Sequence, residues 1–119
     1  MGQTKLNLDL DQFIGGTSTW WRNPIHRNYS YTDGVKYIAE QTESYWLINH
    51  IFSWQYAKEL QNQAFQVWKW KAEDNKGTFI IEDGNRNVLA KDELEYTSFP
   101  DGEVTLWFTD NVLLLPCEY

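Results

Sequence analysis

Four side chains of types that commonly carry out catalysis stand apart in this sequence: His26, His50, Asp33 and Cys117. A histidine held beside a carboxylate can act as a general base, and a thiolate beside a histidine can act as a nucleophile. Neither histidine has another His, Cys or carboxylate at the helical spacing of metal ligands, so the sequence predicts no metal site. Nothing in the sequence brings Cys117 to a histidine, and a lone cysteine is more typical of packing.

Asp33 allows two interpretations. It follows Thr32 and precedes an amphipathic stretch, so the favoured interpretation is that either residue caps a helix. The alternative is a small hydrolase or ligand-binding protein, in which Asp33 works with His26 or His50 in a cleft between helices and sheet. No phosphate-binding glycine loop or dinucleotide fingerprint is present, and the sequence indicates no cofactor.

The most distinctive stretch combines aromatic and basic side chains between residues 20 and 31. Such side chains are enriched at the energetic centres of protein interfaces. They could instead cover the edge of a core, and Trp68 and Trp70, on one face of a predicted strand, share this ambiguity. The candidate binding residues are Trp20, Trp21, Arg22, His26, Tyr29, Tyr31, Trp68 and Trp70.

The charge of the chain is negative and unevenly distributed. A formal net charge of −7 opposes binding to phosphate backbones, so we expect no direct contact with nucleic acid. Residues 61–119 carry eleven acidic and five basic side chains, which favours solubility and a protein partner with a basic surface. A specialised form of this hypothesis is mimicry of nucleic-acid charge by the carboxylates of residues 73–103.

The composition indicates a folded, cytoplasmic protein. Aromatic residues make up 17% of the chain, which supplies enough apolar surface for a core. A single cysteine forms no internal disulfide, as expected in a reducing compartment. No apolar run approaches the roughly 20 residues of a membrane-spanning helix, and residues 1–6 lack an apolar leader.

Three helices are predicted in the first half of the chain. A short one over 8–14 has Asn7 as its cap and Gly15-Gly16 as its stop. The next begins at Thr32 or Asp33 and carries an apolar stripe. The third, over 45–56, is apolar nearly all round and is expected to be buried. Its most buried side chains should be Leu47, Ile48, Ile51 and Phe52.

Strand patterns follow the helices. An N-terminal strand over 17–22 is weakly indicated, and clearer ones cover 65–71, 78–82, 94–99, 103–109 and 112–115, with turn residues between them. The sequence therefore predicts a single α+β domain over 1–119. Its N-terminal helices should pack on one face of a mostly antiparallel sheet of four or five strands.

Several short motifs carry a resemblance over the whole chain. They are Phe13, Gly16-Thr17, residues 31–35, Tyr37, Ala39-Glu40, residues 45–48, 65–69 and 96–100, and the Leu-Leu-Leu-Pro-x-Glu-Tyr motif of residues 113–119. The chain resembles a family of small bacterial proteins of unknown function, often carried by phages, plasmids and other mobile elements. Ser98 stands where that family tends to have Asp, and Cys117 where it tends to have Ser. The resemblance implies a compact bacterial cytoplasmic domain and no particular activity.

These observations favour a non-enzymatic accessory protein. We expect it to meet a protein partner through an aromatic patch bordered by acidic loops, because no catalytic constellation competes with that interpretation. The small hydrolase or ligand-binding protein described above is the alternative. A deep pocket faced by the histidine and aspartate would favour the alternative, and flat exposed aromatics would favour the accessory protein.

Overall fold

Two helices and a seven-stranded sheet make up the computed structural model of this chain, which describes residues 6–119. Residues 1–5 lie outside the described residues. They include most of residues 1–6, where the sequence predicted no apolar leader. The helices are α1 (Asp33–Gln41) and α2 (Tyr45–Trp54), and three short 3-10 turns are η1 (Asp11–Phe13), η2 (Lys58–Leu60) and η3 (Pro116–Glu118).

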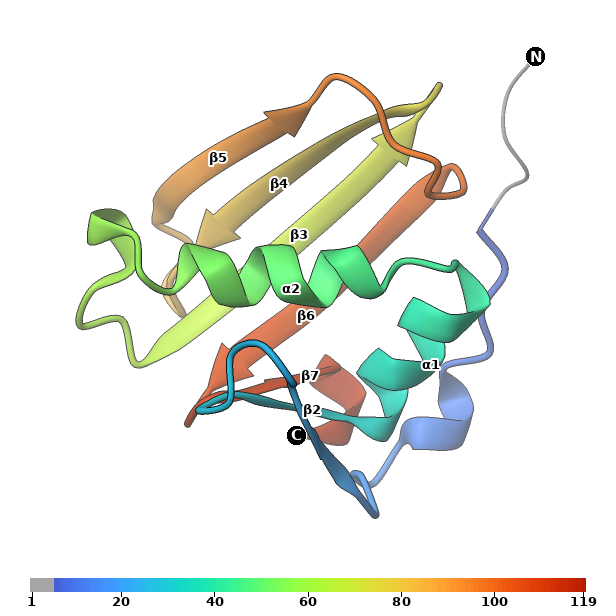
Figure 1. The fold of residues 1–119 in the computed structure, drawn as a ribbon, viewed down its shortest axis with the longest axis horizontal. Coiled ribbons are helices and arrows are strands. Elements are labelled where there is room, and N and C mark those ends of the chain that lie inside the picture. Colours follow the sequence, from blue (N-terminus) through green and yellow to red (C-terminus); the bar gives the residue numbers. More distant parts are fainter. Residues whose placement is uncertain (1–5) are drawn as a thin grey trace.

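The sheet has the strand order β1-β2-β7-β6-β3-β4-β5. Its strands are β1 (Trp20–Arg22), β2 (Ser30–Thr32), β3 (Phe65–Glu73), β4 (Lys76–Glu82), β5 (Val88–Leu94), β6 (Gly102–Thr109) and β7 (Val112–Leu114). Only β2 and β7 pair in parallel, and every other neighbouring pair is antiparallel. Helix α2 crosses the face of β3 and β6, and α1 lies beside it near β2 and β7 (Figure 1).

The predicted α+β class holds, but the predicted sheet of four or five strands after N-terminal helices is wrong. The sheet has seven strands and is mixed, and both helices lie in the middle of the chain, between β2 and β3. Strands of three residues, such as β2, are too short to show the alternation by which a strand is recognised. Strand β5 was missed because it is a charged edge strand, a type that avoids the usual apolar composition.

Two further element predictions need correction. The helix expected over 8–14 is only the 3-10 turn η1, and no side chain caps it. A segment this short does not recover the cost of nucleating an α-helix. Of the strand expected over 94–99, only Leu94 is in a strand, as the last residue of β5, and residues 95–99 form an irregular connection in which the Thr97 N–H donates to the carbonyl of Asn75.

The helix predictions in the middle of the chain are confirmed. Thr32 caps α1, its hydroxyl accepting a 3.5 Å hydrogen bond from the N–H of Val35. Helix α2 begins at Tyr45 as predicted and ends two residues earlier than expected. The four side chains predicted to be most buried on α2 are all 2% exposed or less. The local patterns therefore place α2 at the centre of the core.

Under α2 lie the large rings of the central strands. Trp68 and Trp70 on β3 are fully buried, and their rings meet Trp54 and Trp46 of α2 edge to face. The ring of Trp70 also covers Gly77 on β4, where any Cβ would overlap it. These contacts bury the helix-facing side of the sheet. No helix in the described part of the chain is long and apolar enough to cross a membrane.

Candidate functional site

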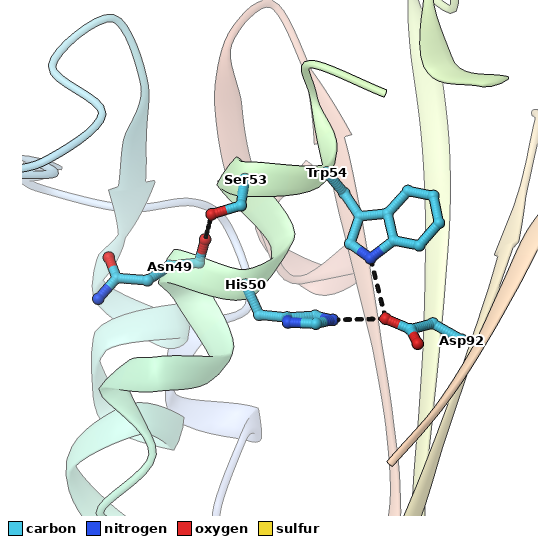
Figure 2. Close-up of polar contacts among 5 residues, drawn as sticks. All are labelled: Asn49, His50, Ser53, Trp54 and Asp92. Carbon is cyan, nitrogen blue, oxygen red and sulfur yellow. Dashed lines mark hydrogen bonds and ion pairs between the residues drawn. The ribbon is translucent and has the colours of Figure 1, made fainter. Parts of the chain in front are cut away.

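A histidine and a carboxylate meet between α2 and the edge strand β5 (Figure 2). His50 Nε2 lies 2.8 Å from Asp92 Oδ2, and the indole N–H of Trp54 donates to the same oxygen at 3.0 Å. His50 and Trp54 are four residues apart on α2 and so project from the same side of the helix. The ring of His50 also stacks on Phe79, at 4.9 Å between centroids.

This arrangement fixes the tautomer of His50. A carboxylate only accepts hydrogen bonds, so Nε2 donates to Asp92, and Nδ1 is the acceptor whenever the imidazole is neutral. The adjacent hollow has a volume of about 330 Å³ and is lined by His50, Ser53, Trp54 and Ala57. The carboxylate beside His50 is therefore Asp92 and not Asp33, which the alternative hypothesis had paired with a histidine.

The second histidine, His26, contacts Ser53, but the direction of the hydrogen bonds does not suit nucleophilic catalysis by the serine. Ser53 Oγ donates to the carbonyl of Asn49 at 2.8 Å, and His26 Nε2 lies 3.3 Å from the same Oγ. When the hydroxyl proton lies on the bond to Asn49, Ser53 Oγ can only accept from His26. A catalytic base would instead accept the serine proton. Because the histidine beside Ser53 is His26, whereas Asp92 contacts His50, these residues do not form a serine–histidine–aspartate triad.

Asp33 contacts neither histidine. It is the first residue of α1, and its carboxylate accepts from the indole of Trp21 and from both the N–H and the hydroxyl of Ser18. The hydrogen bond from Trp21 is the largest cause that lowers the pKa of Asp33, to about 2. Asp33 thus remains ionised and ties β1 to the start of α1.

The remaining catalytic candidate is a packed thiol. Cys117 Sγ lies 3.8 Å from the carbonyl oxygen of Leu10, and burial raises the pKa of the thiol. A raised pKa disfavours the nucleophilic thiolate. Within residues 6–119, no three His, Cys, Asp or Glu side chains gather as a metal site would require.

The candidate binding residues divide into three groups by exposure. Trp20, Trp21 and Arg22 form the whole of β1 and are all exposed, the two indoles at 61% and 37%. His26 and Tyr29 are half-buried, and Tyr29 packs against Phe52 and Phe108. Tyr31, Trp68 and Trp70 are buried and offer no surface to a partner. The three exposed candidates among the eight are therefore the three residues of β1.

Sequence reasoning missed one polar residue that organises this region. Glu118 is buried and accepts hydrogen bonds from the Thr32 hydroxyl at 2.5 Å, the Gly34 N–H at 3.0 Å and the Leu115 N–H at 2.9 Å. A carboxylate is stabilised at the positive N-terminus of α1. A Cβ at position 34 would lie only 2.5 Å from Leu115 Cδ1 and 2.7 Å from Glu118 Oε1, so any larger residue there would displace these side chains. The only signal for this role was the motif of residues 113–119.

Comparison with known proteins gives a family and no function. No curated protein and no solved structure matches the chain. The profile of one family of unknown function, DUF6876, matches residues 4–119. The bacterial and mobile-element context that the resemblance implied stays a prediction. Because the match covers nearly the whole sequence, the chain belongs to the DUF6876 family of unknown function.

Proposed function

We propose that this protein binds a protein partner through β1. The observation that carries the proposal is that all three residues of β1 are exposed while, among residues 6–119, the strand pairs only with β2. An unpaired sheet edge is a template onto which an extended segment can add as a further strand. Tryptophan and arginine, which occupy this edge, are the side chains most enriched among residues that dominate binding energy.

Trp21 is held in place before any partner arrives. Its indole N–H donates to Asp33, and the ammonium of Lys36 lies 4.7 Å from the ring centroid. A side chain that is already ordered loses little conformational entropy when it binds. Trp21 thus offers a partly exposed, rigid ring beside the unpaired edge.

The charge of the protein supports a basic partner through long-range attraction. The net charge of −7 raises the rate at which basic proteins encounter the chain, whichever surface they finally contact. The carboxylates around the β3–β4 turn are far from β1, because β4 and β1 lie toward opposite edges of the sheet (Figure 1). The carboxylates of that turn therefore do not border the aromatic edge, and long-range attraction of a basic partner is the role that we assign to them.

The proposal is tested with the double variant Trp20→Ala/Trp21→Ala and the control Tyr96→Ala. Tyr96 is 71% exposed and follows β5, at the other edge of the sheet. Tagged wild-type protein and both variants are used to capture proteins from a lysate of the source organism, and bound proteins are identified by mass spectrometry.

A partner that binds wild-type protein and the control should be lost from the double variant. Amide hydrogen exchange in the purified complex should then show protection at residues 20–22. A partner retained by the folded double variant, with protection elsewhere, would contradict binding at β1.

A further inference from the structure

A groove runs beside β1 on the face of the sheet opposite Trp21. Trp20 pairs with Thr32, and Trp21 with Tyr31. Successive side chains of a strand alternate between faces, so Trp20 and Thr32 share one face and Trp21 and Tyr31 share the other. The groove has a volume of about 400 Å³ and is lined by Trp20, Asp110, Leu114, Glu118 and Tyr119, among others.

Two aromatic rings in this groove are largely exposed. Trp20 is 61% exposed and Tyr119 is 76% exposed. The ring of Tyr119 is nevertheless supported, because its centroid lies 5.5 Å from that of Trp107 and 6.4 Å from that of Phe65. The groove therefore presents two π faces, of which one is held by neighbouring rings.

The two carboxylates of the groove differ in their availability. Glu118 is buried and accepts three hydrogen bonds, so its charge is already compensated by its donors and the N-terminus of α1. Asp110 is exposed in the β6–β7 turn and makes no hydrogen bond or ion pair with residues 6–119. Asp110 is thus a free negative charge beside the two rings.

We infer that this groove receives an arginine side chain from the partner segment that adds to β1, which rests on the proposed function. A guanidinium group stacks on aromatic faces and donates paired hydrogen bonds to a carboxylate, whereas an ammonium lacks this planar fork. A residue paired with Trp20 in an added strand has its Cβ about 4.5–5.5 Å from the Cβ of Trp20, on the groove side of the sheet. A long side chain at that position extends over Trp20 into the groove.

The test uses the side chain without a partner strand. N-acetyl-arginine N-methylamide is titrated into ¹⁵N-labelled protein, and its neutral near-isostere N-acetyl-citrulline N-methylamide is the matched probe. The indole N–H of Trp20 and the amide of Asp110 are followed by NMR. We expect the arginine probe to shift both signals and to bind about fivefold more tightly than the citrulline probe.

Variants assign the effect to the groove. Asp110→Asn should remove the preference for arginine, and asparagine tolerates the left-handed backbone of this turn position, where φ is 52°. Trp20→Leu gives an independent second variant, in which Asp110 reports a weaker shift. Glu95→Gln, a change of an exposed carboxylate beyond β5, should leave arginine binding unchanged.

Equal binding of the two probes, or no shift of Trp20 and Asp110 with either, would overturn the arginine groove. The proposal that a partner binds at β1 would still hold if the Trp20→Ala/Trp21→Ala variant loses its partner. Conversely, an arginine preference with a partner retained by that variant would show a guanidinium site without strand addition at β1.

Discussion

The two halves of the sheet are built in different ways. Strands β3, β4, β5 and β6 span seven to nine residues each, and β3, β4 and β6 contribute large buried rings to the core under α2. Strands β1, β2 and β7 span three residues each, and the buried contacts of Glu118 and the exposed contact of Asp33 with Trp21 connect this region to α1. The long-stranded half is thus held by many apolar contacts, whereas the short-stranded half depends on a few specific hydrogen bonds.

The difference matters because the exposed aromatic edge belongs to the short-stranded half. Regions with few apolar contacts open at lower free energy than the core, and binding surfaces are often drawn from them. Here the polar contacts keep such a region ordered while β1 stays uncovered. The following predictions, in order of decreasing effect, test whether the two halves are stabilised as described.

Removing residues 113–119 should have the largest effect. Leu113, Leu114 and Leu115 are buried, as the sequence predicted, and each buried leucine contributes about 2–5 kcal/mol. Loss of the segment also leaves α1 without Glu118. We expect the free energy of unfolding in urea to fall by more than about 5 kcal/mol, so that the truncated chain is largely unfolded. A truncated chain that melts at the wild-type temperature would show that β7 adds nothing to the short-stranded half.

Replacing the buried carboxylate should have the next largest effect. In Glu118→Gln an amide group faces the N–H of Gly34 or Leu115 and leaves at least one buried donor without its acceptor. Hydrogen bonds to charged groups contribute about 1.5–3 kcal/mol, and the free energy of unfolding should fall by a similar amount. Glu95→Gln, an exposed control, should change it by less than about 0.5 kcal/mol. Equal stability of the two variants would contradict a stabilising role for the Glu118 carboxylate.

Two tryptophans of the long-stranded half form a matched pair. The indole N–H of Trp68 donates to Gln66 Oε1 at 2.9 Å, whereas the buried N–H of Trp70 has no partner among the described residues. Trp68→Phe loses a hydrogen bond, but Trp70→Phe removes an unsatisfied donor. We expect Trp68→Phe to be the more destabilising by about 1 kcal/mol in urea unfolding. The reverse order would mean that ring packing, and not hydrogen bonding, separates the two sites.

Asp33 should give the short-stranded half a distinct pH dependence. Its folded pKa of about 2 lies below the usual value, so its stabilising effect is present above about pH 4 and is lost as the pH falls through 2. The difference in melting temperature between wild type and Asp33→Asn should be constant at neutral pH and shrink between about pH 4 and pH 2. A difference that is independent of pH would contradict the ionised contact with Trp21.

The smallest effect on stability is expected at the proposed binding edge. Trp20 is 61% exposed, so Trp20→Ala should change the free energy of unfolding by no more than about 0.5 kcal/mol. The same variant should weaken binding of the partner. A large loss of stability in Trp20→Ala, measured by thermal unfolding, would mean that this ring is part of the fold of the short-stranded half.

The sequence by itself determined the local elements with a clear period. The apolar character of residues 45–56 predicted the buried α2, and the alternation in 65–71 placed Trp68 and Trp70 on one face of β3. Thr32-Asp33 before an amphipathic stretch predicted a helix cap at one of these two residues, and the structure shows that it is Thr32. These features depend on neighbours within a few residues, because helix and strand geometry fix which nearby side chains share a face.

Only the tertiary structure decided which distant groups meet. Asp92 pairs with His50 from 42 residues away, and Glu118 reaches Gly34 from 84 residues away. The parallel pairing of β2 with β7 likewise joins two three-residue strands from opposite ends of the chain. No local period encodes such pairings, since they arise when packing of the larger elements brings the groups within hydrogen-bonding distance. Tertiary packing therefore placed Asp92 beside His50, whereas Asp33 accepts a hydrogen bond from Trp21.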